Sequence, residues 1–169
     1  MFTADRGYAG DGASAWLDLG EAITAGGQYG RDGATLGVWI NAGSSTASYQ
    51  IGVAEGLSGA NSLYLRSSAT AAGVRLNGGT ASYAVAGVGH LAATRVSATA
   101  FRSFLDGANI GETNAASVAP AGTGCLLRAG GSYSAHRIAA AYLGGGLGDG
   151  EVAAIHARLN TYLSGIGAQ

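Results

Sequence analysis

Residues 89–112 read GHLAATRVSATAFRSFLDGANIGE, and this stretch decides the fold. Two apolar runs flank Asp106 and Gly107 near its end. An Asp-Gly pair in that setting indicates a hairpin, because both central residues of a type I′ turn need a positive φ. The polar residues at 96–99 make a second connection. The stretch therefore predicts a meander of three antiparallel strands, at residues 90–95, 100–105 and 108–112.

Alternating apolar side chains on both sides of this meander predict further strands. In ATLGVWINA at 34–42, the aliphatic residues at even positions share one face, and Trp39 lies on the other. In SYQIGVA at 48–54, the same period places Tyr49 on one face with Ile51 and Val53. So many short strands are typical of an antiparallel sandwich. The other expected strands lie at residues 14–19, 62–67, 73–87 (a hairpin turning at 77–79), 124–128 and 137–143.

The C-terminal segment changes to the period of a helix. From Asp149 onward, apolar side chains recur at spacings of three and four, which is the pattern of an amphipathic helix. Asp149 is expected to be its N-cap, and Glu151 to favour the positive end of the helix dipole. Gly165 and Gly167 are expected to end it. The pattern predicts one helix at about 149–164, packed on the sandwich.

Several of these motifs carry a family resemblance. HLAAT at 90–94, followed by a strand that ends in LDG at 105–107, resembles the central meander of concanavalin A-like lectin/glucanase domains of the laminin-G and pentraxin type. GDGASAWLDLG at 10–20 is similar to the opening of those domains, and LGDGEVAAIHARLNTYLSGIG at 147–167 resembles their tail in bacteriophage and prophage virion proteins. The resemblance implies one all-β domain over residues 1–169, an antiparallel jelly-roll β-sandwich with strands at about 14–143 and one C-terminal α-helix.

Composition excludes several classes of protein. Of the 169 residues, 47% are hydrophobic and only 11% are charged, and the net charge of −1 gives no electrostatic footprint for nucleic acid. Polar residues interrupt the longest uncharged run, at 33–54, so we expect no membrane insertion. The opening MFTADRG lacks the apolar region of a signal peptide. The single cysteine, Cys125, excludes an internal disulfide framework and is expected to be a buried small hydrophobe.

The acidic and histidine residues do not form a catalytic pattern. Glycoside hydrolysis needs two carboxyl groups about 5–10 Å apart, and the glucanases of the resembled group carry alternating carboxylates on one strand. Here the nearest such pair, Asp149 and Glu151, lies at a helix start. His90, His136 and His156 lack metal-ligand spacing, and we expect His90 to form structural hydrogen bonds and His156 to be solvated. We therefore expect no enzymatic activity.

We expect no cofactor, although the resemblance also implies calcium as an alternative. Several members of the group bind calcium through carboxylates and carbonyls at loop rims. The loop positions that would serve are Asp5, Asp11, Asp18 and Asp32.

Glycan binding is the chemistry left open by these exclusions. Sugar sites combine aromatic faces with a few polar groups. If the aliphatic stripes face the core, the opposite faces present an Arg–aromatic cluster that could hold a glycan or an acidic polysaccharide. The same side chains could instead pack under loops, under the C-terminal helix or against a neighbouring subunit. The proposed glycan-binding residues are Trp39, Tyr64, Arg66, Arg102 and Phe104. The alternative loop residues are Asn41, Asn61, Tyr133 and His136.

The resemblance implies a role in a phage or phage-like particle. The expected function is a non-catalytic, lectin-like adhesion module of a tail fibre, spike or head fibre, which binds cell-surface glycan and other virion proteins. The chain would assemble into the virion in the bacterial cytoplasm, as a homo-oligomer. The alternative is a purely structural virion decoration or assembly protein whose sheet face is an oligomer interface. A glycan hydrolase is the third hypothesis.

Overall fold

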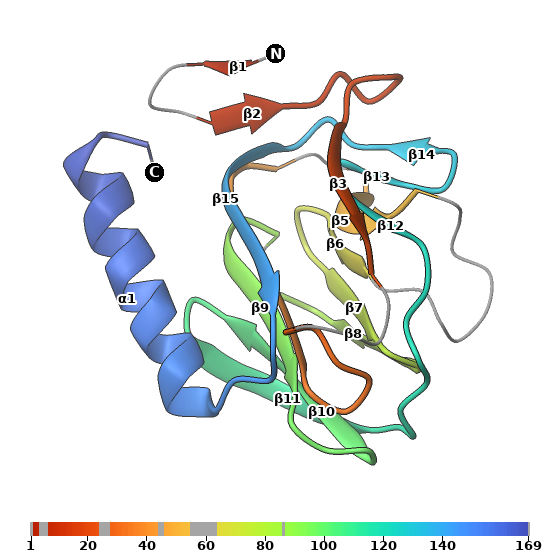
Figure 1. Cartoon of the computed structure of the whole chain (residues 1–169). Helices are drawn as coiled ribbons and strands as arrows, with labels where there is room; N and C mark the ends of the chain where they lie inside the picture. Colours follow the sequence, from red (N-terminus) through yellow and green to blue (C-terminus); the bar gives the residue numbers. More distant parts are fainter. Residues whose placement is uncertain are drawn as a thin grey trace.

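The computed structural model describes residues 2–3, 7–23, 28–43, 46–54, 64–85 and 87–168. Two antiparallel sheets pack face to face, and one C-terminal helix, α1 (Asp149–Gly165), covers the outer face of one of them (Figure 1). The predicted all-β sandwich with a C-terminal helix is confirmed. No helix in these ranges is long and apolar enough to cross a membrane.

Each sheet is built from strands that are distant in sequence. Sheet A has the order β1 (Phe2–Thr3), β2 (Gly7–Ala9), β15 (Arg137–Gly144), β4 (Ala34–Ala42), β9 (Gly89–Arg95), β10 (Ala100–Leu105), β11 (Ala108–Asn114). Sheet B has the order β3 (Leu17–Ala22), β12 (Thr123–Leu126), β5 (Ser48–Val53), β6 (Tyr64–Ser67), β7 (Ala72–Leu76), β8 (Gly79–Tyr83). A small hairpin is formed by β13 (Arg128–Ala129) and β14 (Ser132–Tyr133).

The meander at the centre of the sequence forms as predicted. Strands β9, β10 and β11 are consecutive neighbours in sheet A, and Leu105 pairs with Ala108 across the second turn. Asp106 has a φ of 51° and Gly107 a φ of 78°, as the predicted turn requires. Asp106 also fixes the start of the meander, because its Oδ1 accepts the backbone N–H of His90 at 2.8 Å.

Two expected strands differ from the prediction. The first begins at Leu17 and not at residue 14, because the carboxylate of Asp11 accepts the backbone N–H groups of residues 13–15 and removes them from any ladder. The strand expected at 124–128 breaks at Leu127, whose φ of 62° ends β12 and starts the β13–β14 hairpin. The start of the strand expected at 62–67 lies outside the described residues.

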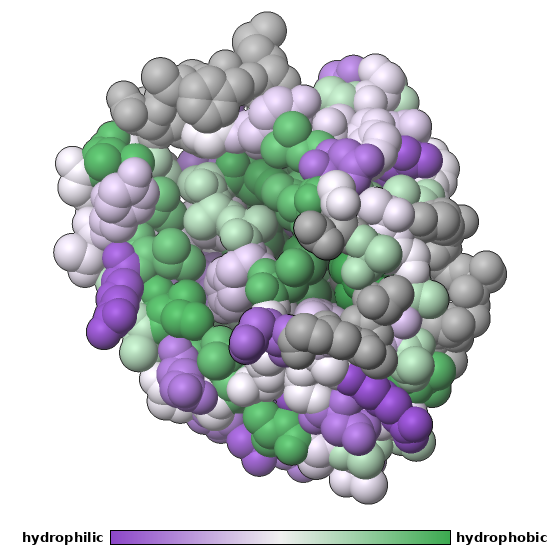
Figure 2. Space-filling model, in the orientation of Figure 1, coloured by the Kyte–Doolittle hydropathy of each residue, from purple (hydrophilic) through white to green (hydrophobic). Residues whose placement is uncertain are grey.

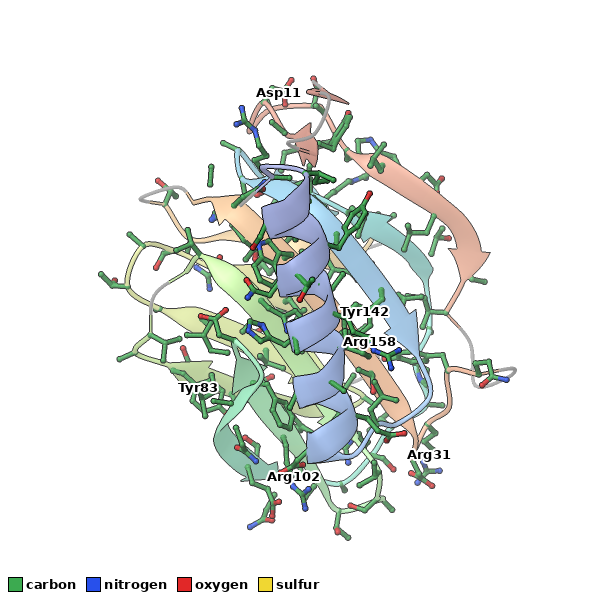
Figure 3. The ribbon with its side chains drawn as sticks, turned by 90° about the vertical axis from the view of Figure 1, so that its left-hand side faces the viewer. Asp11, Arg31, Tyr83, Arg102, Tyr142 and Arg158 are labelled. Carbon is green, nitrogen blue, oxygen red and sulfur yellow. The ribbon has the colours of Figure 1, made fainter. Side chains whose placement is uncertain are left out.

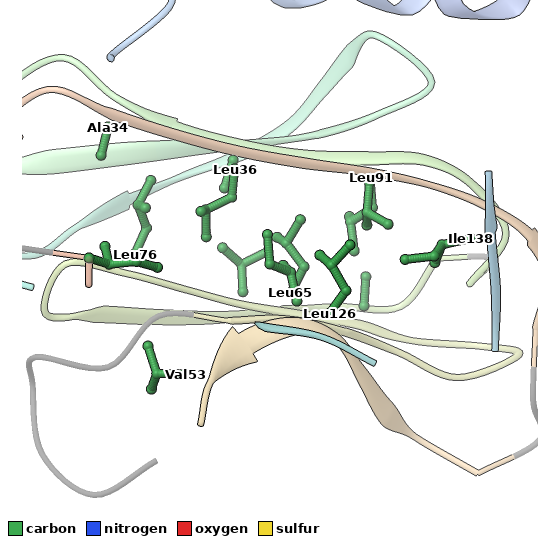
Figure 4. Close-up of a cluster of buried hydrophobic side chains, with 14 of the residues drawn as sticks. Ala34, Leu36, Val53, Leu65, Leu76, Leu91, Leu126 and Ile138 are labelled. Carbon is green, nitrogen blue, oxygen red and sulfur yellow. The ribbon is translucent and has the colours of Figure 1, made fainter. Parts of the chain in front are cut away.

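The core lies between the two sheets. Leu36 and Leu91 of sheet A face Leu65, Leu76 and Leu126 of sheet B (Figure 4). Burying each such side chain contributes about 1.5–3 kcal/mol. Cys125 is buried, as predicted.

A buried arginine ties the two sheets together at one end. Arg95 of β9 is fully buried and donates to the carbonyl of Leu76, at the end of β7, at 3.2 Å. It also donates to the carbonyl of Ala115 at 3.0 Å. The buried guanidinium is stable here because these carbonyls accept hydrogen bonds that water would accept in the unfolded chain.

Helix α1 begins at Asp149, as predicted, but its N-cap differs from the prediction. Gly148, and not Asp149, is the N-cap: its backbone is extended, and its N–H donates to the Glu151 carboxylate at 2.7 Å. The Asp149 side chain bonds Arg102 instead. Gly167, with a φ of 68°, follows the helix end, in agreement with the prediction.

Candidate functional site

The five residues predicted to bind glycan lie on two different faces of the sandwich. Trp39, Arg102 and Phe104 belong to the outer face of sheet A, where α1 packs (Figure 3). Tyr64 and Arg66 belong to β6, on the outer face of sheet B. The structure therefore does not bring the five together into one cluster.

Trp39 and Phe104 pack beneath α1, which is the alternative that the sequence left open. Trp39 is 6% exposed and packs with Leu163, and the fully buried Phe104 packs with Val152. Sheet A is thus covered on both faces, which explains why seven consecutive residues of β4 are buried. Neither ring offers a free face to a ligand.

A stack of aromatic rings fixes the middle of the helix to the sheet. Trp39 stacks on His90 at 6.0 Å and on His156 at 5.4 Å between ring centroids. His90 Nε2 also shares a hydrogen bond with the Tyr142 hydroxyl at 3.0 Å, so the structural role predicted for His90 is confirmed. The prediction of a solvated His156 is wrong, because α1 turns that ring onto the sheet. Burial, together with the neighbouring His156, lowers the pKa of His90 to about 4.

Arg102 holds the start of α1. Its Nε donates to Glu112 at 2.8 Å and its guanidinium to Asp149 at 2.7 Å. The hydrogen bond from Arg102 lowers the pKa of Asp149, and the two carboxylates raise that of Arg102. Its charge is therefore already neutralised by residues of the chain.

The outer face of sheet B carries a ladder of tyrosine and arginine side chains. Tyr49 pairs with Arg66 across β5 and β6, and Tyr64 pairs with Arg75 across β6 and β7. The Arg66 guanidinium lies 5.6 Å from the Tyr49 centroid, and that of Arg75 lies 5.4 Å from the Tyr64 centroid. The two tyrosine rings meet edge to face at 5.2 Å. We call Tyr49, Tyr64, Arg66 and Arg75 the Tyr–Arg ladder.

The sequence missed Tyr49 and Arg75 as site residues. Strict alternation placed Tyr49 on the core face with Ile51 and Val53. A register shift between Tyr49 and Ile51 against β6 turns the tyrosine to the outer face. Arg75 pairs with Tyr64 across β6 and β7, so it lies on the same face as Tyr64, but this can be seen only once that pairing is known.

A polar pocket opens at one end of the Tyr–Arg ladder. Its volume is about 580 Å³, within the range of small-molecule sites, and we call it the rim pocket. Its lining side chains supply five hydroxyl groups, two of them on aromatic rings, and one guanidinium, and none of them is acidic. The lining residues are Gly12, Ala13, Thr46, Ala47, Ser48, Tyr49, Arg66, Gly131, Ser132 and Tyr133.

A buried histidine positions one of those hydroxyls from below. His136, which the sequence offered as a loop ligand, is fully buried and cannot touch a ligand directly. Its Nδ1 shares hydrogen bonds with Ser48 Oγ at 2.9 Å and Ser134 Oγ at 3.0 Å. Burial lowers the pKa of His136, which keeps the ring neutral. Ser48 is thereby held in the wall of the rim pocket.

Two further contacts brace the rim of the pocket. The Arg128 guanidinium lies 4.4 Å from the Trp16 centroid and 5.5 Å from the Tyr133 centroid, and its Nε donates to the Gly130 carbonyl at 2.7 Å. The Asp11 carboxylate accepts three backbone N–H groups of its own loop, which hold the pKa of that carboxyl well below its usual range. Arg128 thus connects the loop at 11–16, through Trp16, to the β13–β14 hairpin that carries Tyr133.

The other predicted loop residues do not converge on a ligand site. Asp18 accepts the N–H of Gly20 at 2.8 Å, and Asp32 accepts the Ser117 hydroxyl. Asn41 donates to the Ala168 carbonyl at 2.9 Å. No group of three or more His, Cys, Asp or Glu side chains is arranged to hold a metal ion in the described parts of the chain. The calcium candidate Asp5 and the loop candidate Asn61 lie outside those parts.

The fold is shared with solved structures of binding domains. The carbohydrate-binding module CBM40 of the Ruminococcus gnavus IT-sialidase, solved with α2,6-sialyllactose, matches 88% of this chain and 97% of its own at 14% identity, with a TM-score of 0.55. The heptameric SAP-like pentraxin of Limulus polyphemus matches 89% of this chain and 79% of its own at 11% identity, with a TM-score of 0.57. The binding domain of Paraclostridial Mosquitocidal Protein 1 matches 88% of this chain and 46% of its own at 9% identity, with a TM-score of 0.50.

These similarities lie in the structure and not in the sequence. No protein-family model and no curated protein sequence matches the chain. The structural matches agree with the resemblance of the meander to concanavalin A-like domains. The chain has the concanavalin A-like jelly-roll fold.

Proposed function

We propose that this chain is a non-catalytic glycan-binding module whose site is the rim pocket together with the Tyr–Arg ladder. The observation that carries the proposal is the pocket itself: aromatic faces, hydroxyls and one guanidinium converge on about 580 Å³ of open space. Tyrosine faces pack against sugar C–H groups, and the hydroxyls of Thr46, Ser48 and Ser132 can bond sugar hydroxyls. Glycan binding is also supported by the similar fold of the CBM40 module, which was solved with α2,6-sialyllactose.

Binding is tested with a glycan array and with whole bacterial cells, using Tyr49→Ala and Tyr133→Ala variants. Each substitution removes an aromatic wall of the pocket, and we expect a loss of affinity of about 10-fold, the size of a 1.4 kcal/mol contact. Tyr162→Ala is the matched control, because Tyr162 lies on α1 and is 63% exposed. Binding that both pocket variants keep in full would contradict the site. Trp39→Ala is unsuitable, since that ring supports α1.

The absence of catalysis is tested separately. Glycans that bind should be released unchanged, with no reducing ends formed over long incubation. Release of reducing sugar that disappears on replacing one carboxylate would favour the hydrolase hypothesis instead.

We also propose that the module acts in host adhesion on a phage or phage-like particle. The support is the resemblance of residues 147–167 to the tail of virion versions of this domain, in a segment that folds as the helix closing sheet A. Mass spectrometry of purified particles and immunogold labelling test the location. Detection of the chain only in the cytosolic fraction would contradict it.

A structural role in assembly is the second candidate, favoured by an apolar seam. Between β15 and β3, two adjoining hollows of about 350 and 230 Å³ share Leu126 and Ala141, and their rims expose Leu17 (37%) and Leu143 (36%) (Figure 2). Helix α1 covers the outer face of sheet A, so on that side of the molecule a second copy of the chain would use this seam. Light scattering over a concentration series, with Leu143→Asp as the disrupting variant, tests for a homo-oligomer. A monomer at all concentrations would contradict this role.

A further inference from the structure

We infer that the ligand of the rim pocket is an acidic saccharide, whose carboxylate binds the guanidinium of Arg66. The inference rests on the proposed glycan-binding function and deepens it, since it names the chemical class of the sugar. This class includes uronic acids and sialic acids alike, because both present a carboxylate on a sugar ring.

The charge of the pocket is the first observation. Arg66 is the only charged residue among those that line it, so the pocket has a net positive charge. Arg66 is exposed, and no carboxylate of the described residues lies within 4.0 Å of its guanidinium. Arg102 shows the contrast, because two carboxylates of the chain already bind it. A ligand carboxylate would therefore meet an unneutralised guanidinium at Arg66.

The guanidinium is also held in place before a ligand arrives. Leu65 and Ser67, on either side of Arg66 in β6, are buried, so the backbone beneath it is fixed. Its planar group lies over the Tyr49 ring, which itself packs against Tyr64. An arginine side chain that is already ordered loses less conformational entropy when it forms a bidentate ion pair with a carboxylate.

The surroundings of Arg66 leave room for such a pair. Its cross-strand neighbour on β7 is Gly73, which has no side chain to cover the guanidinium. On the other side, the pocket supplies the hydroxyl of the exposed Ser132 for the ring hydroxyls of the same sugar. Arginine, hydroxyl and tyrosine face thus surround the position of one acidic sugar.

The Tyr–Arg ladder extends this chemistry beyond the pocket. Arg75 lies two residues along β7 from Gly73, on the diagonal from Arg66, where Cα atoms are about 7–8 Å apart in antiparallel sheets. Its guanidinium packs over Tyr64 and so repeats the arrangement of Arg66 over Tyr49. The Nε of Arg75 also donates to the Thr80 hydroxyl at 2.9 Å, so the inference rests on Arg66 alone.

The test compares saccharides that differ only in charge. Binding of polygalacturonate and of its methyl ester, and of 3′-sialyllactose and of its carboxyl methyl ester, is measured by calorimetry with the whole chain. We expect the acidic member of each pair to bind about 10- to 100-fold more tightly, as for a charge-assisted hydrogen bond. Arg66→Gln should bring that ratio close to one, and Arg66→Lys, which keeps the charge without the fork, should leave an intermediate ratio.

Arg158→Gln is the matched control for a general loss of positive charge. Arg158 is exposed on α1, away from the Tyr–Arg ladder (Figure 3), and its substitution should leave the ratio unchanged. Equal losses in Arg66→Gln and Arg158→Gln would overturn the inference, since binding would then follow overall charge. Equal affinity of the wild type for acidic and neutral saccharides would overturn the inference and leave the proposed function intact. Binding of neither kind would overturn both.

Discussion

Acidification should destabilise the protein through His90, at the contact between α1 and sheet A. The pKa of this imidazole falls from its ordinary 6.5 to about 4 in the folded protein, chiefly because it is buried. The unfolded chain therefore binds a proton more readily, so the contribution to stability is complete above pH 6.5 and is lost as the pH falls through 4. A shift of about 2.5 pKa units corresponds to about 3 kcal/mol of unfolding free energy.

Four side chains surround His90, and they determine how its protonation would destabilise the contact between α1 and sheet A. The Tyr142 hydroxyl of β15 shares a hydrogen bond with the Nε2 of His90. His156 of α1 stacks on His90 at 5.5 Å and lowers the pKa of His90. The Asp106 carboxylate accepts the backbone N–H of His90 and raises that pKa. Trp39 of β4 completes the stack. A protonated His90 would place an unpaired charge inside this stack, so we expect the helix to separate from the sheet first.

Guanidinium chloride unfolding between pH 7.5 and 4.5 measures the predicted loss. Trp39 fluorescence, in a Trp16→Phe background, reports on the helix contact. His90→Gln removes the titrating group while keeping a donor for Tyr142, and its unfolding free energy should vary less with pH than that of the wild type. His136, whose pKa is also lowered by burial, accounts for the remaining slope, and His136→Gln serves as the comparison. A pH slope that is identical in His90→Gln and the wild type would refute the reasoning.

Three substitutions test the packing around α1, each measured by chemical unfolding. Phe104→Ala empties a fully buried site beneath the helix and should cost about 3–5 kcal/mol, and a cost below 1 kcal/mol would contradict the observed burial. Gly107→Ala should cost about 1–2 kcal/mol, because the φ of 78° is left-handed and the added Cβ would lie 3.0 Å from that of His156. Arg102→Gln should change the unfolding free energy only slightly, since its ion pairs are half-exposed, and should leave glycan affinity unchanged. A large loss of glycan affinity in the Arg102→Gln variant would show that Arg102 contributes to binding.

The parts of the fold that local sequence determines were predictable. The Asp106-Gly107 turn and the strands on either side of it follow from backbone preference and alternation, which need no knowledge of distant partners. The aliphatic stripe of β4 was assigned to the core for the same reason. Tyr49 was misplaced because its bulge depends on how β5 pairs with β6, a contact between separate segments of the chain.

The candidate site was only partly predictable because it is built from segments distant in sequence. The rim pocket takes its walls from the loop after β2, the start of β5, the end of β6 and the β13–β14 hairpin. Tyr64 and Arg66 were found through their alternation with Leu65. Trp39 and Phe104 showed the same alternation, and the sequence could not tell which of the two outer faces the C-terminal helix would cover.

That choice of face governs where a ligand can bind. Trp39, Tyr142 and Phe104 give the outer face of sheet A three large aromatic side chains, and covering them with α1 removes their apolar surface from water. The outer face of sheet B carries arginines and tyrosine hydroxyls, which lose less by staying exposed. The helix therefore covers the face whose burial contributes most to stability, and the face left open is the one whose guanidinium groups can attract an acidic ligand. A glycan site on sheet A would require the separation of α1, whereas a site on the Tyr–Arg ladder needs no such rearrangement.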